Sequence, residues 1–132
     1  MKPTGNLKQI LVVDGSNIVL DRIKGILKEV DGIDRVLTAN GYAAAIGVMT
    51  TTHIDIVLSE ITLFDKSGFE LLTYIKHHYP ETKTIMLTNL AGDFYRNKSK
   101  ALGADHFIDK SEEFENIARI IQQYHSALFQ LH

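Results

Sequence analysis

The chain contains no cysteine and no tryptophan, and only 2 of its 132 residues are proline. Without cysteine it can form neither a disulfide framework nor a cysteine-ligated metal site. Its apolar runs are too short to span a bilayer, and its N-terminal residues do not form an apolar signal segment. These absences favour a cytoplasmic protein that is held together by a hydrophobic core.

A strong net charge is also absent, because 14 basic and 16 acidic side chains leave a formal charge of -2 at pH 7. This small charge predicts no direct nucleic-acid partner and no anionic membrane partner. The hydrophobic content of 45% is enough for a compact core, in a chain too short for two independent domains. We therefore expect a single domain over residues 1–132, with a core of about 8–128.

Short apolar segments alternate with segments whose apolar residues recur at helical spacing. The predicted strands cover residues 9–13, 35–39, 54–59, 83–88 and 106–108. The predicted helices cover a stretch between 19 and 30, then 41–49, 68 to about 79, 94–102, and about 111 to the end. Five strand–helix pairs predict an α/β protein with a doubly wound parallel sheet, because parallel strands need right-handed crossover connections.

Several helix ends are marked by specific residues. Ser67 and Glu70 have the spacing of a capping box at the start of the third helix, and Pro80 follows its end. Asn40 is predicted to N-cap the second helix, and Gly103 to end the fourth. The third helix therefore has the best-defined boundaries.

Polar or charged side chains mark the ends of four predicted strands. Asp14 and Glu60 follow the first and third strands, Thr88 ends the fourth, and Lys110 comes shortly after the fifth. In an open parallel sheet the carboxyl ends of the strands face one crevice, where such folds place ligands or chemistry. Each residue alone would be ordinary at its position. Together they predict one site.

These segments resemble the receiver domain of two-component response regulators. The resemblance is carried by residues 10–14, 55–72, 87–88 and 103–110. It implies a flavodoxin-like sheet of five parallel strands in the order 2-1-3-4-5, with five helices. It also implies a role in phosphorelay signal transduction, in which an aspartate after the third strand takes a phosphoryl group from a histidine kinase with Mg²⁺.

The match to the family's phosphorylation site is incomplete. Asp14 matches the first of two adjacent acidic residues in the family, but Gly15 stands where the second, a metal ligand, is expected. Glu60 occupies the position of the phosphoacceptor aspartate. Thr88 matches the switch hydroxyl, and Lys110 matches the lysine after the fifth strand. The resemblance therefore implies an atypical, degenerate receiver without the phosphoacceptor aspartate.

Three further positions bear on this comparison. Phe107 matches the aromatic residue that rotates on activation in the family. Phe64 replaces the usual proline in the loop after the third strand, and Ser111 replaces the proline that commonly follows the lysine.

Losing one carboxylate and lengthening another disturbs the near-octahedral oxygen coordination that Mg²⁺ needs. We expect weak or absent Mg²⁺ binding, no metal ligands and no cofactor. The longer side chain of Glu60 would also be misaligned for phosphoryl transfer, where misplacement by about 1 Å can cost roughly 100-fold. We expect Glu60 to contact Lys110 directly, or to accept a hydrogen bond from Thr88.

The main hypothesis is a pseudo-receiver that is not an enzyme and acts by phosphorylation-independent protein–protein interaction. Its partner would be a signalling protein, such as a histidine kinase or a downstream effector. A homodimer through the fourth helix, fifth strand and fifth helix is also predicted, with Leu128, Phe129 and Leu131 as contact residues.

Two alternatives remain open. One is a working phosphoacceptor response regulator that uses Mg²⁺ and a neighbouring carboxylate, such as Asp14 or Asp65. The other is a flavin- or nucleotide-binding flavodoxin-like protein, although the sequence contains no GxGxxG or P-loop motif.

Overall fold

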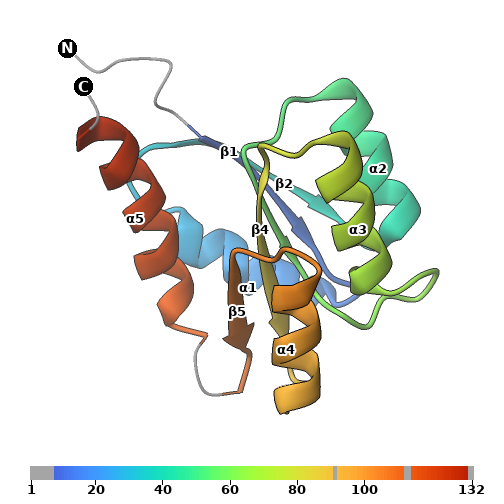
Figure 1. Ribbon diagram of the computed structural model, residues 1–132. Helices are drawn as coiled ribbons and strands as arrows, with labels where there is room; N and C mark the ends of the chain where they lie inside the picture. The colour runs from blue at the N-terminus through green and yellow to red at the C-terminus, as the bar shows by residue number, and fades with distance from the viewer. Residues whose placement is uncertain (1–7, 91, 112–113, 131–132) are drawn as a thin grey trace.

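The computed structural model shows a central parallel sheet with helices on both faces (Figure 1). It describes residues 8–90, 92–111 and 114–130, with 125–130 described by their backbone only. The strands are β1 (Lys8–Val13), β2 (Ile33–Ala39), β3 (Ile56–Ser59), β4 (Lys83–Thr88) and β5 (His106–Asp109). The helices are α1 (Asn17–Leu27), α2 (Tyr42–Thr51), α3 (Gly68–His78), α4 (Asp93–Ala101) and α5 (Asn116–Gln130). The five strands lie in the order β2-β1-β3-β4-β5, which confirms the predicted fold class and strand order.

The predicted N-cap of the second helix and the predicted start of the last helix are wrong. Asn40 is not the N-cap of α2, because that position belongs to Gly41, which has no side chain with which to cap the helix. The last helix begins at Asn116 rather than near Ser111. Ser111 instead lies in a turn, where its N–H and hydroxyl donate to Asp109 Oδ1 at 2.9 and 2.6 Å.

The predicted contact residues near the C-terminus are only partly described. Leu128 and Phe129 lie in α5, where the structure describes the backbone but not these side chains. Leu131 lies outside the described residues. Among the helices of the described part of the chain, none is both long and apolar enough to cross a membrane.

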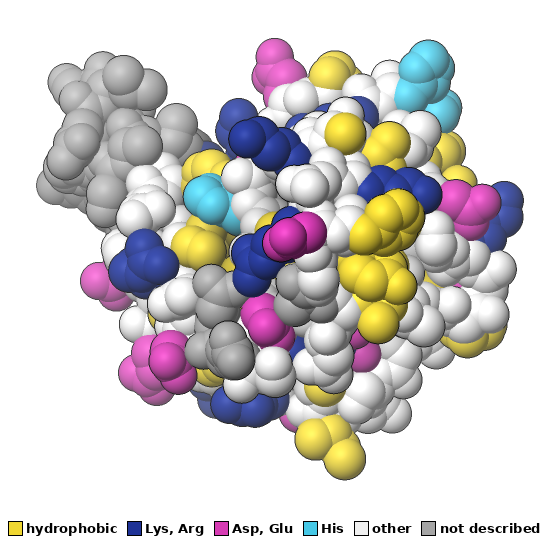
Figure 2. Space-filling model, turned by 60° about the horizontal axis from the view of Figure 1, so that its bottom comes forward, with side chains coloured by type: hydrophobic (Ala, Val, Ile, Leu, Met, Phe, Trp, Pro, Cys, Tyr) yellow, Lys and Arg dark blue, Asp and Glu magenta, His cyan; other side chains and the backbone are white. Residues whose placement is uncertain are grey.

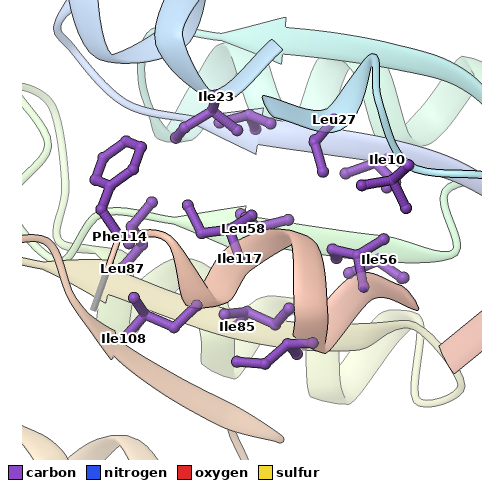
Figure 3. Close-up of a cluster of buried hydrophobic side chains, with 14 of the residues drawn as sticks. Ile10, Ile23, Leu27, Ile56, Leu58, Ile85, Leu87, Ile108, Phe114 and Ile117 are labelled. Carbon is purple, nitrogen blue, oxygen red and sulfur yellow. The ribbon is translucent and has the colours of Figure 1, made fainter. Parts of the chain in front are cut away.

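Each face of the sheet has its own apolar core, because alternate residues of a strand point to opposite sides. On the face covered by α1 and α5, the packed residues include Ile10, Leu58, Ile85, Ile23 and Ile117 (Figure 3). On the face covered by α2 and α3, the packed residues include Leu11, Val57, Ala45 and Leu71. Burial on both sides explains why the central strands are continuous apolar runs rather than alternating patterns.

A close approach of two backbone segments brings the end of β3 against the start of α3. The Gly68 N–H donates to Ile61 O at 2.6 Å. A Cβ built at Gly68 would overlap the Glu60 carbonyl oxygen and lie 2.9 Å from Ile61 Cα. The predicted capping box of Ser67 and Glu70 is confirmed at the same turn. Gly68 therefore fixes how the chain leaves β3.

The substitution Gly68→Ala tests this approach. Its methyl group would force the backbone at Glu60 to move, so we expect the free energy of unfolding to fall by about 1–3 kcal/mol. Gly25→Ala is the matched control, because a Cβ built at Gly25 meets no heavy atom of the described residues within 4 Å. That variant should gain about 0.4–1 kcal/mol from reduced freedom of the unfolded chain. Equal urea midpoints for the two variants would contradict the close approach.

Candidate functional site

The carboxyl ends of the strands bring the predicted site residues to one edge of the sheet. Val13 of β1 and Ser59 of β3 are paired in register, so Asp14 and Glu60 follow at the same level. Lys110 directly follows β5. Figure 2 views the molecule from this edge, where acidic and basic side chains lie next to one another in the middle of the face.

Lys110 joins the two carboxylates directly. Its Nζ lies 2.5 Å from Asp14 Oδ2 and 2.6 Å from Glu60 Oε1. The side chains of Lys110, Asp14 and Glu60 are only 9%, 6% and 10% exposed, respectively. We call these three residues the charge cluster. Of the two contacts predicted for Glu60, the one with Lys110 is therefore present.

The other carboxylate oxygens of the charge cluster accept hydrogen bonds from nearby backbone groups. Asp14 Oδ1 accepts from the Ser16 N–H at 2.9 Å. Glu60 Oε2 accepts from the Ile61 and Thr62 N–H groups at 2.6 and 3.1 Å. Buried charges are tolerated when they are paired and hydrogen-bonded. Every carboxylate oxygen of the cluster meets this condition.

The environment of Lys110 favours its charged form. Burial by itself lowers the pKa of the ammonium group, but the hydrogen bonds and negative charges of Asp14 and Glu60 more than offset this effect. The pKa of Lys110 is therefore raised above its ordinary value of 10.5. One positive charge thus remains fixed between two carboxylates at neutral pH.

The other predicted site residues surround the charge cluster less directly. Thr88 is fully buried, its hydroxyl accepts from the Leu90 N–H at 3.1 Å, and its carbonyl accepts from the Lys110 N–H at 2.9 Å. The Phe107 ring is partly buried, with the Arg96 guanidinium 4.7 Å from its centroid. Gly15 is exposed. A Cβ built there would approach, among the described residues, only the Asn40 carbonyl oxygen, at 3.9 Å.

Asp65 has a role that the sequence did not predict. Its carboxylate accepts hydrogen bonds from the N–H groups of Tyr42 and Ala43, at 2.8 and 3.0 Å, and so caps α2 from another loop. It also accepts from the Lys66 N–H at 3.0 Å. The hydrogen bonds from Ala43 and Tyr42 lower the pKa of Asp65 below its ordinary value of 3.8. No local sequence pattern signals this cap, because donor and acceptor are more than 20 residues apart.

The substitution Lys110→Met tests the energetic role of the charge cluster. It would leave two buried carboxylates without their cation, so we expect the free energy of unfolding at pH 7 to fall by about 3–5 kcal/mol. The exposed Lys100, replaced in the same way, is the control and should change stability by less than about 0.5 kcal/mol. Urea unfolding of both variants provides the measurement.

The raised pKa of Lys110 also predicts a dependence of stability on pH. The folded protein holds this proton more tightly than the unfolded chain does, so the stabilisation is fully present below pH 10.5. It is lost as the pH rises through the folded-state pKa. In urea unfolding above pH 10.5, the unmodified protein should lose stability more steeply than Lys110→Met. If stability fell equally with pH in the two proteins, the contacts of Lys110 with Asp14 and Glu60 would be contradicted.

Comparison with known sequences places these observations in a family. Residues 10–122 match the response regulator receiver domain. The chain is similar to the transcriptional regulatory protein YvrH of Bacillus subtilis, with 32% identity over 101 residues, covering 76% of this chain and 42% of that protein. It is also similar to the fimbriae Z protein of Escherichia coli K12, with 25% identity, covering 92% of this chain and 56% of that protein. The chain thus spans about half the length of these curated relatives.

The fold has close counterparts among solved structures. A CheY-like response regulator receiver domain protein from Methanospirillum hungatei superposes with a TM-score of 0.83 and 28% identity. The match covers 96% of this chain and 99% of that one. Both the sequence match and the strand order agree with this family. This chain belongs to the response regulator receiver domain family of two-component signalling.

Proposed function

We propose that this receiver domain signals by phosphorylation-independent protein–protein contact, as a pseudo-receiver. The observation that supports the proposal most strongly is the position of Lys110 Nζ, within 2.6 Å of both Asp14 and Glu60. A cation supplied by the chain itself therefore lies between the carboxylates. The site would then keep one arrangement without phosphate.

The donor set of the charge cluster does not suit Mg²⁺. This ion needs near-octahedral oxygen ligands and gives up its waters reluctantly. Asp14 and Glu60 each have one oxygen on Lys110 and the other on backbone N–H groups, and Gly15 has no side chain to offer. No group of three or more His, Asp or Glu side chains in the described part of the chain could hold a metal ion. We propose that Mg²⁺ binding is weak, because the ion would have to displace Lys110.

The carboxylates near the site are also poorly placed for phosphoryl transfer. Such a reaction depends on an attacking oxygen aligned with the donor phosphorus. Glu60 uses Oε1 for Lys110 and Oε2 for two backbone amides, which would have to be released before attack. Asp65, an alternative phosphoacceptor, is engaged by the N-terminal amides of α2. These contacts favour the proposal over a phosphoacceptor that uses a neighbouring carboxylate.

We further propose that the surface formed by α4, β5 and α5 contacts the partner, which is a signalling protein or a second copy of the chain. In α4, Ser99 is the buried residue, and Phe94 is 65% exposed. The Lys98 ammonium lies 5.7 Å from the centroid of the Phe94 ring. An exposed aromatic ring suits a contact surface, since aromatic residues are enriched in such surfaces.

Phosphorylation chemistry tests the proposed function. Incubation with Mg²⁺ and acetyl phosphate should give no increase in protein mass. Incubation with Mg²⁺ and beryllofluoride should give no ligand-induced shift in NMR spectra. The double variant Gly15→Asp with Glu60→Asp is the matched comparison, because Gly15 has room for a side chain. Its shorter acceptor and added carboxylate should restore a mass increase that depends on Mg²⁺.

A stable mass increase in the unmodified protein would contradict the proposal. If Asp14→Ala or Asp65→Ala removed that increase, the substituted carboxylate would be shown to be required for the reaction. A double variant that folds but stays unmodified would show that residues other than 15 and 60 prevent the reaction.

A further inference from the structure

We infer that Asp65 is a positioning residue for the charge cluster, and that it acts through the segment of residues 60–68, which we call the β3–α3 loop. The loop begins at Glu60, and its residue Asp65 is hydrogen-bonded to the N-terminus of α2. Figure 1 shows the loop beside the lower end of that helix. Asp65 thereby couples α2 to the charge cluster.

The beginning of the loop is bound to the charge cluster. Glu60 Oε2 accepts from the Ile61 and Thr62 N–H groups, while Glu60 Oε1 contacts Lys110. The Gly68 N–H closes the base of the loop on Ile61 O. The position of these backbone groups therefore determines where the Glu60 carboxylate lies relative to Lys110.

The far part of the loop is bound to α2. Asp65 accepts hydrogen bonds from the N–H groups of Tyr42 and Ala43. These groups belong to the first turn of the helix and have no hydrogen-bond partner within it. A negative charge at this end also interacts favourably with the helix dipole. A Cβ built at Gly41 would lie 2.5 Å from the Phe64 ring and 2.8 Å from Asp65 Oδ1, so the loop packs closely on the N-cap of α2.

The two ends of the loop can influence each other because they are close together in the sequence. Asp65 is five residues after Glu60, and the base of the loop is closed at Gly68. When Asp65 releases α2, the backbone between the two anchors gains freedom, and the amides of Ile61 and Thr62 lose their fixed positions. A coupling between two sites is reciprocal, so a disturbed charge cluster must equally loosen the cap on α2.

The regulatory meaning of this coupling rests on the proposed function, but the coupling itself does not. It predicts how amide groups respond to substitution, with or without phosphorylation. Detection of a phosphorylated form of the protein would overturn the proposed function. It would not decide the coupling, which amide hydrogen exchange tests separately.

The test is amide hydrogen exchange measured by NMR on the whole chain. In Asp65→Ala the amides of Tyr42 and Ala43 should exchange about tenfold faster, which corresponds to a loss of about 1.4 kcal/mol. The amides of Ile61 and Thr62, which Asp65 does not touch, should also exchange at least about threefold faster. Asp65→Asn keeps one acceptor oxygen and should restore part of the protection at all four amides.

Asp55→Ala is the matched control. Asp55 also accepts a backbone hydrogen bond, from the Gln9 N–H at 2.8 Å, but it precedes β3 at the opposite end of the strand from Glu60. Its removal should leave the exchange of Ile61 and Thr62 unchanged. Gly41→Ala provides a second route, because its methyl group must displace the Phe64 ring or Asp65 and should reproduce the effect at Ile61 and Thr62.

The reciprocal experiment uses Lys110→Met, in which Tyr42 and Ala43 should exchange at least about threefold faster. The inference is overturned if Asp65→Ala and Gly41→Ala accelerate amide exchange only at Tyr42 and Ala43. It is equally overturned if Lys110→Met leaves these two amides as protected as in the unmodified protein.

Discussion

One ammonium group holds the end of β1 and the end of β3 in a fixed relation. Lys110 Nζ contacts the carboxylate that directly follows each strand, and all three side chains are largely buried. Two buried carboxylates without this cation would carry a large desolvation and repulsion cost. The geometry of the loops after these strands therefore depends on Lys110.

The fold follows from the sequence because its strongest signals are local. Continuous apolar strands and helical spacing predicted the α/β class, and the boundaries of β4 were predicted to the residue. Strand order came from the resemblance, since periodicity does not report which strands are neighbours. The predictions for Asn40 and for the start of α5 were wrong because a distant side chain, Asp65, caps α2 and a turn at Asp109 and Ser111 delays α5.

The gathering of Asp14, Glu60 and Lys110 was predictable, because the carboxyl ends of parallel strands meet at one edge. The sequence could not show that a single Nζ would contact both carboxylates, since this depends on side-chain conformations in the folded protein. The binding of Glu60 Oε2 to its own following amides was also not predictable, because it requires the conformation of the β3–α3 loop. That loop in turn depends on Asp65, whose partners in α2 are distant in sequence.

We propose that Lys110 takes the place that a divalent cation would need. The most direct measurement follows the NMR signal of the Lys110 ammonium group, labelled with ¹⁵N, during a titration with Mg²⁺. We expect the signal to keep its chemical shift at millimolar Mg²⁺, because both carboxylates stay on Nζ. A saturable shift of this signal, accompanied by shifts at Asp14 and Glu60, would show that Mg²⁺ displaces Lys110 and would contradict the account.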